Sequence, residues 1–294
     1  MPELASRLHM RNLLYLLEGI FQTSRLSPPS LAAIAVSINP GLIGSLLVGL
    51  SFAKSYAWSL GIPLITVNHM LGHVFANYLC HPDLKPPFLA LIVSGGHTEL
   101  VYFETDTQFR HIGRTVDDAA GETFDKTAKL LKLGYPGGPV IQAAAAGGNP
   151  DFIHFPRAFP QKDNFNFSYS GLKTAVLQYL ASQTPDWLAQ HQSDVAASIQ
   201  AAIVEPLVAK TLRYAKRHNI RQVLLSGGVA ANQLLREQMT AQAHTFGGRV
   251  FFPELRLCMD NAAMIAAAAI PKLQAGLYSD LSVNAFSQKG TRLL

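Results

Sequence analysis

Two copies of one short pattern constrain the fold of this chain more than any other feature of its sequence. Residues 91–96 read LIVSGG and residues 223–228 read VLLSGG, so each apolar strand pattern runs directly into Ser-Gly-Gly. Glycines at a strand end let backbone N–H groups approach an anion closely. A single turn of this kind is commonly structural, whereas a repeat at two strand ends leaves a structural and a phosphate-binding role equally open.

Strand and helix patterns alternate around these two turns. Strands are predicted at 31–38, 62–68 and 249–253, a strand-turn-strand hairpin at 88–104, and a strand-turn-helix at 221–239. Helices are predicted at 4–20, 42–60, 69–80, 119–133, about 172–218 and 260–275. The mixture predicts an α/β or α+β class. A length of 294 residues favours two lobes, and the linker HPDLKPP (81–87) predicts a boundary between them.

Composition excludes several protein classes. Only 15% of the residues are charged, so the chain can bury a large core. Residues 41–60 come closest to the length and apolarity of a membrane-spanning helix, but they contain Lys54 and several serines, which favours a buried helix. The N-terminus has early charges and no signal-peptide pattern. Cys80 and Cys258 are the two cysteines, which indicates a reducing compartment. A formal charge of +5 permits an anionic partner such as RNA without requiring one.

The segment HMLGH places His69 and His73 four residues apart, on one face of a predicted helix. A zinc peptidase of this spacing has Glu after the first histidine as its general base, and Met70 stands there instead, so the peptidase interpretation is disfavoured. Asp260 is a candidate third ligand, although it could also be the N-cap of the last predicted helix. A two-histidine, one-carboxylate set suits Fe(II) or Zn(II), whereas without a third ligand the two histidines could be merely polar or helix-capping residues.

An acidic pattern follows the first glycine turn. Asp118, Glu122 and Asp125 are spaced i, i+4 and i+7, which places them on one face of one predicted helix. These carboxylates could recognise a ribose hydroxyl or a second metal. Alternatively, they form a solvated face with Lys126 and Lys129 as partners.

Three other segments are open to a binding or a structural role. Gly137 and Gly138, within GYPGGP, predict a tight and sterically open turn that could hold a ligand or only end a helix. The aromatic and polar loop at 164–174, which contains Lys173, could stack bases or pack on the core. Asn232 could cap a helix or donate a hydrogen bond to a nucleotide.

Taken together, these motifs resemble those of the tRNA N6-adenosine threonylcarbamoyltransferase family, the TsaD proteins, formerly called O-sialoglycoprotein endopeptidases. The motifs occur in the family's order: PELASR, NPGLIGSLLVG, NHMLGH, LIVSGGHTEL, DDAAGETFDKTAKLL, YPGGP, FSYSGLKT, SGGVAANQLLR and CMDNAAMIA. The resemblance implies a two-lobed α/β fold of the actin/hexokinase/Hsp70 (ASKHA) type with a duplicated core. The expected lobes are residues 1–86 with a C-terminal helical segment, 258–294, returning to them, and residues 87–257.

The resemblance also implies an acyltransferase of the cytoplasm, with no membrane partner. It would transfer the threonylcarbamoyl group from threonylcarbamoyl-AMP to N6 of adenosine 37 in tRNAs that read ANN codons, which is the synthesis of t6A. The implied partners are a paralogous TsaB-like subunit and a TsaE-like ATPase. One divalent metal, Fe(II) or alternatively Zn(II), would be held by His69, His73 and Asp260. The adenylate would be bound by Ile92, Val93, Ser94, Gly95, Gly96, Asp125, Gly138 and Asn232.

The chain departs from the family pattern in three places. Family members begin about 35–40 residues earlier, with a strand and a phosphate-contacting turn, so the first lobe is expected to be N-terminally truncated. Asn68 stands where the family has a histidine before His69, and residues 281–294 lack the family's Arg-Pro-Arg-Trp pattern. The alternative function is therefore a non-catalytic binding or scaffold subunit of the same tRNA-modifying complex. The sequence identifies no general base.

Overall fold

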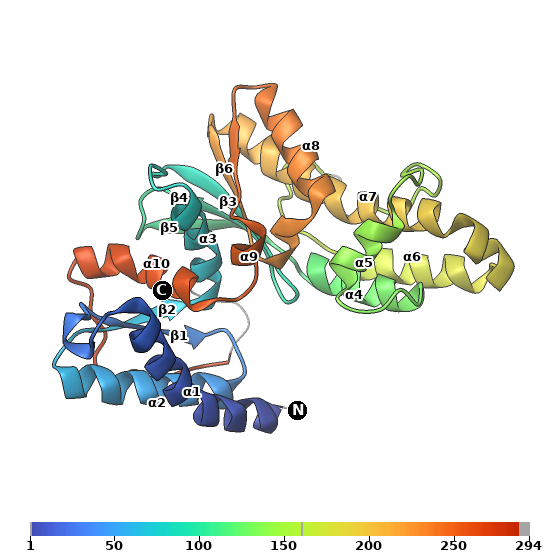
Figure 1. Cartoon of the computed structure of the whole chain (residues 1–294). Coiled ribbons are helices and arrows are strands. Elements are labelled where there is room, and N and C mark those ends of the chain that lie inside the picture. Colours follow the sequence, from blue (N-terminus) through green and yellow to red (C-terminus); the bar gives the residue numbers. More distant parts are fainter. Residues whose placement is uncertain (1, 160, 288–294) are drawn as a thin grey trace. The chain divides into compact units, whose positions relative to one another are not determined.

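The computed structural model describes residues 2–159 and 161–287, and the chain divides into two compact units (Figure 1). Unit 1 consists of residues 1–79 and 261–294, and unit 2 consists of residues 80–260. The sequence placed these two boundaries at 86/87 and 257/258 instead. The last seven residues of the expected C-terminal helical segment lie outside the described residues, and its described part is helical only up to Gln274.

Unit 1 is built on a two-stranded parallel sheet. Strands β1 (Ile34–Asn39) and β2 (Leu64–Asn68) pair in parallel, and helix α2 (Ile43–Leu60) connects them. Helix α1 (Pro2–Ser24) packs on α2, while α10 (Ala262–Gln274) packs on both strands. Helix α3 (His69–Cys80) continues directly from the end of β2. The predicted strands and helices of this unit are therefore confirmed.

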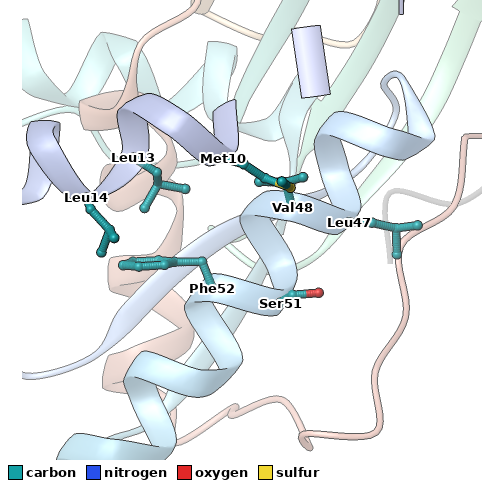
Figure 2. Close-up of a pocket in the computed structure, with 7 residues that line it drawn as sticks. All are labelled: Met10, Leu13, Leu14, Leu47, Val48, Ser51 and Phe52. Atoms are coloured by element: carbon teal, nitrogen blue, oxygen red, sulfur yellow. The ribbon is translucent and has the colours of Figure 1, made fainter. Parts of the chain in front are cut away.

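The apolar residues of unit 1 are only partly covered. Its buried clusters are small; one joins Ile38 to Leu50 and Ala285. Tyr15 and Leu16 of α1 are mostly exposed. An apolar hollow of about 380 Å³ lies between α1 and α2 and is shown in Figure 2. Its lining residues are Met10, Leu13, Leu14, Leu47, Val48, Ser51 and Phe52.

Unit 2 contains a five-stranded mixed sheet in the order β5-β4-β3-β6-β7. The strands are β3 (Phe88–Val93), β4 (Thr98–Phe103), β5 (Phe109–Arg114), β6 (Gln222–Ser226) and β7 (Arg249–Phe251). Strands β3 and β4 form the predicted hairpin, and β3 pairs in parallel with β6. Because parallel strands end at the same edge of a sheet, both Ser-Gly-Gly turns lie at one edge.

Helices complete unit 2 around one continuous core. They are α4 (Ala120–Leu130), α5 (Gly137–Ala144), α6 (Ser170–Ala181), α7 (Pro185–Arg217), α8 (Gln233–His244) and α9 (Leu255–Cys258), with the 3-10 turn η2 (Gly228–Ala231) before α8. The core joins Leu91, Phe124 and Ile203, all fully or almost fully buried. Strand β5 and helix α5 were not predicted, and the helices predicted over about 172–218 are confirmed as α6 and α7.

Among the described residues, α7 is the one helix long and apolar enough to cross a membrane, and the stretch 41–60, which the sequence predicts to be a buried helix, does not meet that test. Of its apolar window, 83% is buried within the protein. Since the central helix of an ordinary globular core passes the same test, its length and hydropathy are weak evidence of a membrane span.

Candidate active site

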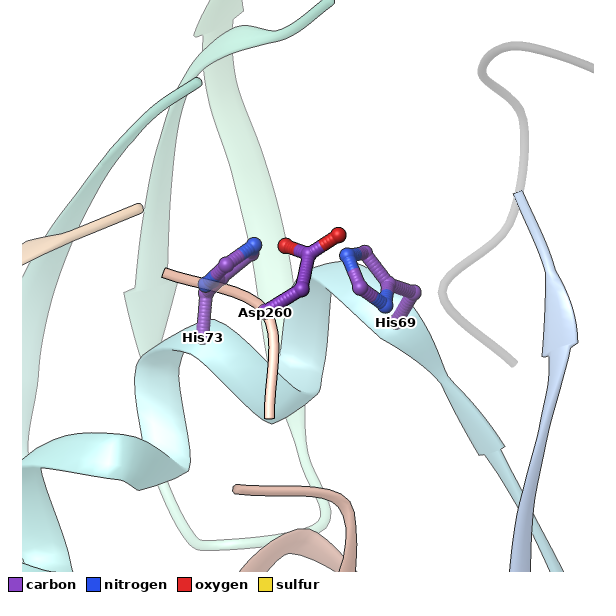
Figure 3. Close-up of side chains that lie close together, drawn as sticks. All are labelled: His69, His73 and Asp260. Carbon is purple, nitrogen blue, oxygen red and sulfur yellow. The ribbon is translucent and has the colours of Figure 1, made fainter. Parts of the chain in front are cut away.

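The three predicted metal ligands lie together in the structure. One ligand atom from each of His69, His73 and Asp260 lies within 4.8 Å of the other two (Figure 3). The imidazole rings of the two histidines are 4.9 Å apart, centre to centre, and nearly perpendicular. His73 is buried, His69 is partly buried and Asp260 is exposed. The cluster is therefore open on one side to an exogenous ligand.

The sequence at the end of β2 determines where α3, and with it the first histidine, begins. The side chain of Asn68 accepts a hydrogen bond of 2.8 Å from the backbone N–H of Met70. This bond satisfies one of the N–H groups that have no partner inside the helix. Asn68 therefore caps the turn that carries His69. The residue that departs from the family pattern has a structural role in this chain.

A glycine between the two histidines allows α10 to pack closely on α3. A Cβ atom added to Gly72 would lie 2.7 Å from Cδ1 of Ile265, so a larger residue there would force the Ile265 side chain on α10 to move. Asn261, the N-cap of α10, accepts a hydrogen bond of 2.9 Å from Met264 N–H. Asp260 directly precedes this cap, so the packing at Gly72 helps to place its carboxylate. The alternative that Asp260 itself caps the helix is wrong, because Asn261 does so.

The donor set fits a divalent transition metal. Imidazole nitrogens and carboxylate oxygens bind such an ion at about 2.0–2.2 Å, so two ligands of one ion are at most about 4.4 Å apart. The observed limit of 4.8 Å requires only small side-chain rotations to meet that distance. Met70 is buried in the position of a peptidase's glutamate, so α3 supplies no general base beside the cluster.

The first Ser-Gly-Gly turn is compact but accessible. The backbone N–H of Ser94 donates to the carbonyl oxygen of His97, and the hydroxyl oxygen of Ser94 accepts from His97 N–H. Gly95 and Gly96 are exposed, and a Cβ atom at either position would meet nothing within 4 Å. Ile92, by contrast, is fully buried and pairs with strands on both sides. Of the predicted segment, the two glycines are therefore the positions most open to an anion.

The second turn packs against the first. Gly227 has a φ of +87°, which favours glycine, and its Cα approaches the backbone of Val93 too closely to admit a Cβ atom. Asn232 follows and caps α8 by accepting a hydrogen bond of 3.0 Å from Leu235 N–H, while its amide donates to Gln200. The predicted capping role is thus confirmed. The predicted nucleotide contact of Asn232 stays a prediction. Its buried side chain already has two hydrogen-bond partners within the protein, Leu235 N–H and Gln200.

Helices α4 and α5 extend this contact network. Gly121 of α4 packs on the backbone of Ser94, and Gly137 of α5 packs on the backbone of Asp125, again without room for a Cβ atom. The carboxylate of Asp125 accepts a hydrogen bond of 2.7 Å from Gly137 N–H. The predicted sterically open turn is therefore wrong for Gly137, which starts a helix and is tightly packed. Gly138 also lies in α5 and not in a turn, but the predicted open space is present there, because an added Cβ atom would meet nothing within 4 Å.

One more hydrogen bond closes the network into a ring. The side chain of Gln142 on α5 accepts a hydrogen bond of 2.7 Å from the backbone N–H of Gln233, the first residue of α8. The ring then runs from the end of β3 through α4, α5 and α8 and back to β3. The structure therefore brings the predicted adenylate-binding residues, which are scattered over 92–232 in sequence, to one part of unit 2.

The acidic pattern is not the single helix face that its spacing predicted. Asp118 lies before α4, whose first residue is Ala120, so the three carboxylates do not share one helix. Lys126 binds two of them: its ammonium lies 2.7 Å from Asp118 and 2.9 Å from Glu122. The alternative of a surface ion-pair network is therefore confirmed for these two residues. Asp125 alone turns toward α5.

A residue that the sequence reasoning missed anchors the FSYSG loop. The carboxylate of Asp117 accepts hydrogen bonds from the hydroxyls of Ser168 and Ser170 and from the backbone N–H groups of Tyr169 and Ser170. Burial raises the pKa of this carboxyl, but the hydrogen bonds outweigh it and hold the pKa below its ordinary value. Phe167 and Tyr169 are buried, so their predicted alternative of packing on the core is confirmed.

A buried lysine anchors the preceding part of the same loop. The ammonium of Lys210 on α7 donates hydrogen bonds of 3.0, 2.9 and 2.8 Å to the carbonyl oxygens of Phe159, Asn164 and Asn166. Burial and the nearby charge of Arg213 lower the pKa of Lys210 to about 8. No local pattern could have indicated this lysine, because its partners are more than 40 residues away in sequence.

Comparison with known proteins identifies the family. The sequence profile of TsaD, described as tRNA N6-adenosine threonylcarbamoyltransferase, matches residues 1–267. The chain belongs to the tRNA N6-adenosine threonylcarbamoyltransferase family. Members of that name from Kosmotoga olearia, Moorella thermoacetica and Syntrophotalea carbinolica are 47%, 48% and 49% identical to it. Each alignment covers 97% of this chain and 84%, 83% and 83% of the respective relative.

Solved structures support the α/β fold expected for this TsaD-family chain. Full-length HypF in a phosphate- and nucleotide-bound form aligns with a TM-score of 0.67 at 15% identity, covering 90% of this chain and 42% of HypF. HypF of T. kodakarensis aligns with a TM-score of 0.66 at 16% identity, covering 90% and 43%. The chain thus spans less than half of each HypF chain. At such low identity the likeness concerns the fold alone.

Proposed function

We propose that the chain transfers the threonylcarbamoyl group from threonylcarbamoyl-AMP to N6 of adenosine 37 in tRNAs that read ANN codons. The observation that carries this proposal is the gathering of His69, His73 and Asp260 within 4.8 Å in a member of this transferase family. The accessible glycine turn of unit 2 supports it, because acyl transfer from an adenylate requires a place for the phosphate.

Within this proposal, His69, His73 and Asp260 hold one divalent ion, Fe(II) or alternatively Zn(II). Such an ion supplies Lewis-acid polarisation of acyl or phosphate oxygens when it is bound. The two imidazoles provide neutral donors and Asp260 a negative one, which leaves coordination positions for substrate oxygens. Asn68 and Gly72 act as positioning residues, because they set the start of α3 and the approach of α10.

The adenylate is assigned to the ring of contacts in unit 2. Gly95 and Gly96 are exposed residues, and their backbone N–H groups would bind the phosphate. The second carboxylate oxygen of Asp125 would accept a hydrogen bond from a ribose hydroxyl, while the first holds Gly137. The open face of Gly138 leaves room for the nucleotide. AMP is then the leaving group when N6 of the adenine attacks the carbamoyl carbon.

The proposal extends to the setting of the reaction. The duplicated two-lobed ASKHA core, the cytoplasmic location, the paralogous TsaB-like subunit and the TsaE-like ATPase are all expected from the family resemblance. The chain's formal charge of +5 is compatible with a tRNA substrate.

The proposal is tested in a strain depleted of its own transferase and supplied with this chain. Mass spectrometry of the tRNA nucleosides should show t6A with the wild type and not with His69→Ala. His81→Ala is the matched control, because His81 bonds the Phe252 carbonyl and lies outside the cluster. It should restore t6A as the wild type does.

Two outcomes would contradict the proposal. If soluble wild-type protein restores no t6A but still binds tRNA or the partner subunit, the chain is a non-catalytic scaffold. If His69→Ala restores t6A fully, the transfer does not depend on the cluster. Cleavage of peptide substrates that is abolished by a chelator would favour a metal-dependent peptidase, although Met70 stands where such an enzyme has its general-base glutamate.

A further inference from the structure

A second hollow of unit 2 lies along the C-terminal half of α4 and has a basic character. Its volume is about 530 Å³. It is lined by Asp125, Lys126, Lys129, Lys132, Gly134 and Tyr135. Neither the metal cluster nor the glycine turns account for its three lysines and its tyrosine.

Two of the lysines have their charge available for a ligand. Lys126 already binds Asp118 and Glu122. Lys129 and Lys132 are exposed, and within residues 2–159 and 161–287 no carboxylate lies at ion-pair distance from either of them. Asp125 keeps its negative charge, because the partner of its carboxylate is the neutral N–H of Gly137, and it is the single carboxylate among the lining residues. Three lysines against one carboxylate leave the lining of the hollow with an excess of positive charge.

Lys132 stands in a backbone conformation that favours glycine. Its φ is +56°, and α4 ends there with hydrogen bonds from Lys132 N–H to the Lys129 carbonyl and from Leu133 N–H to the Ala128 carbonyl. This pattern is the Schellman motif, in which glycine is the usual residue at the left-handed position. A lysine at this position costs backbone energy, which points to a role for its side chain.

Tyr135 presents a large ring to solvent beside these charges. It is 82% exposed, the highest value among the large hydrophobic side chains of the described chain. Gly134, with a φ of +106°, and Pro136 flank it and set the direction of the chain on either side. An exposed aromatic ring between cationic side chains is the arrangement on which unpaired bases stack while the cations meet phosphates.

We propose that this hollow is a docking site for an RNA strand of the substrate tRNA. Tyr135 stacks on an unpaired base, and Lys129 and Lys132 bind the phosphates next to it. The inference rests on the proposed function for the identity of the RNA. Charge complementarity selects the partner, because an acidic peptide would use the lysines but would leave the exposed ring without a base to stack on.

The test measures binding of unmodified tRNA by the full-length chain at several salt concentrations. Lys132→Gly is the most informative variant, since glycine is favoured at that φ and the variant should fold at least as well as the wild type. We expect the double variant Lys129→Gln/Lys132→Gly to bind tRNA about tenfold more weakly at low salt. The slope of log K against log salt should fall by roughly one for each lysine. Tyr135→Ala should weaken binding without changing that slope.

Lys162→Gly, which removes an exposed lysine outside the hollow, is the matched control and should bind tRNA as the wild type does. In turnover assays, the hollow variants should raise the KM for tRNA and leave the KM for threonylcarbamoyl-AMP unchanged. Unaltered tRNA binding by the double variant, or no binding by the wild type, would overturn the inference. So would a raised KM for the adenylate alone. Wild-type tRNA binding without t6A formation would instead count against the proposed function and leave the docking site standing.

Discussion

The metal cluster and the glycine ring of unit 2 are built by opposite means. The cluster consists of three side chains that reach one point from α3 and from the residue before α10. The ring consists of backbones that approach so closely at Gly121, Gly137 and Gly227 that no side chain fits. The comparison teaches that truncating a side chain should remove the function of the first site, whereas adding a single carbon should break the second.

The largest effect is expected from adding one carbon to the ring. In Gly137→Ala, the new Cβ would lie well under 3.0 Å from backbone atoms of α4, which cannot yield as a flexible side chain does. We expect a loss of about 2–4 kcal/mol in the free energy of unfolding. Urea denaturation measures it.

The neighbouring glycine provides the matched control. A Cβ at Gly138 meets nothing, and alanine is the better helix former, so Gly138→Ala should be neutral or stabilise by up to about 1 kcal/mol. Equal losses in both variants would show that the close approach at Gly137 is not the cause. Weakened adenylate binding in Gly138→Ala would sharpen the assignment of its open face to the nucleotide.

At the cluster, removal of one ligand should act on metal affinity and hardly on the fold. We expect His69→Ala to bind Zn(II), used as the probe, at least about 100-fold more weakly than the wild type. His69 is only partly buried, so the thermal midpoint of the metal-free protein should change little. Calorimetric titration with His81→Ala as control measures the affinity. Unchanged Zn(II) binding would place the metal elsewhere.

In unit 2, the side chain of Asp117 stabilises the loop before α6 through hydrogen bonds and not through close backbone packing. Asp117→Ala should cost about 1–2 kcal/mol, because it leaves N–H groups at the start of α6 without their acceptor. The folded-state pKa of Asp117 is below its unfolded value of about 3.9. Its stabilisation is therefore complete above about pH 4 and is lost as the pH falls through the folded-state pKa.

The difference between wild type and Asp117→Ala in urea denaturation should accordingly be constant from pH 5 to 7 and shrink below about pH 4. A difference that persists undiminished in acid would mean that the carboxylate form is not what holds the loop.

The smallest effect is expected from the helix cap beside the cluster. Asn68→Ala removes the acceptor for Met70 N–H and should cost about 1 kcal/mol of stability. Because the frayed turn contains His69, Zn(II) affinity should also fall severalfold. Asn68→Asp keeps a capping oxygen and should retain both properties. Loss of stability without any change in affinity would show that the start of α3 does not position the histidine.

The site predictions that the structure confirms were based on residues that lie close together in the sequence. His69 and His73 are four residues apart on one helix, so their proximity follows from helix geometry alone. The two strand-turn patterns were recognisable because an apolar run and a glycine pair are adjacent in sequence. Asn232 could be identified as a cap for the same reason.

The features that the sequence did not predict depend on contacts between residues far apart in the chain. Asp118 lies outside α4, which begins at Ala120 beside the close contact of Gly121 with the backbone of Ser94. Asp117 and Lys210 act on partners about 50 residues away, at a distance no spacing rule covers. The helix predicted over 119–133 ends at Leu130, and Lys132, which was expected to be helical, takes the left-handed conformation instead.

The measurement that tests the central claim most directly is t6A formation per bound metal ion in one purified preparation. The wild-type chain, with the partner subunit and ATPase, would be stripped by chelation, reloaded in steps with Fe(II) or Zn(II), and given threonylcarbamoyl-AMP and unmodified tRNA. We predict that t6A rises in proportion to bound metal, saturates at one ion per chain and is absent from Asp260→Ala at every loading. Full transfer by the metal-free wild type would contradict the account.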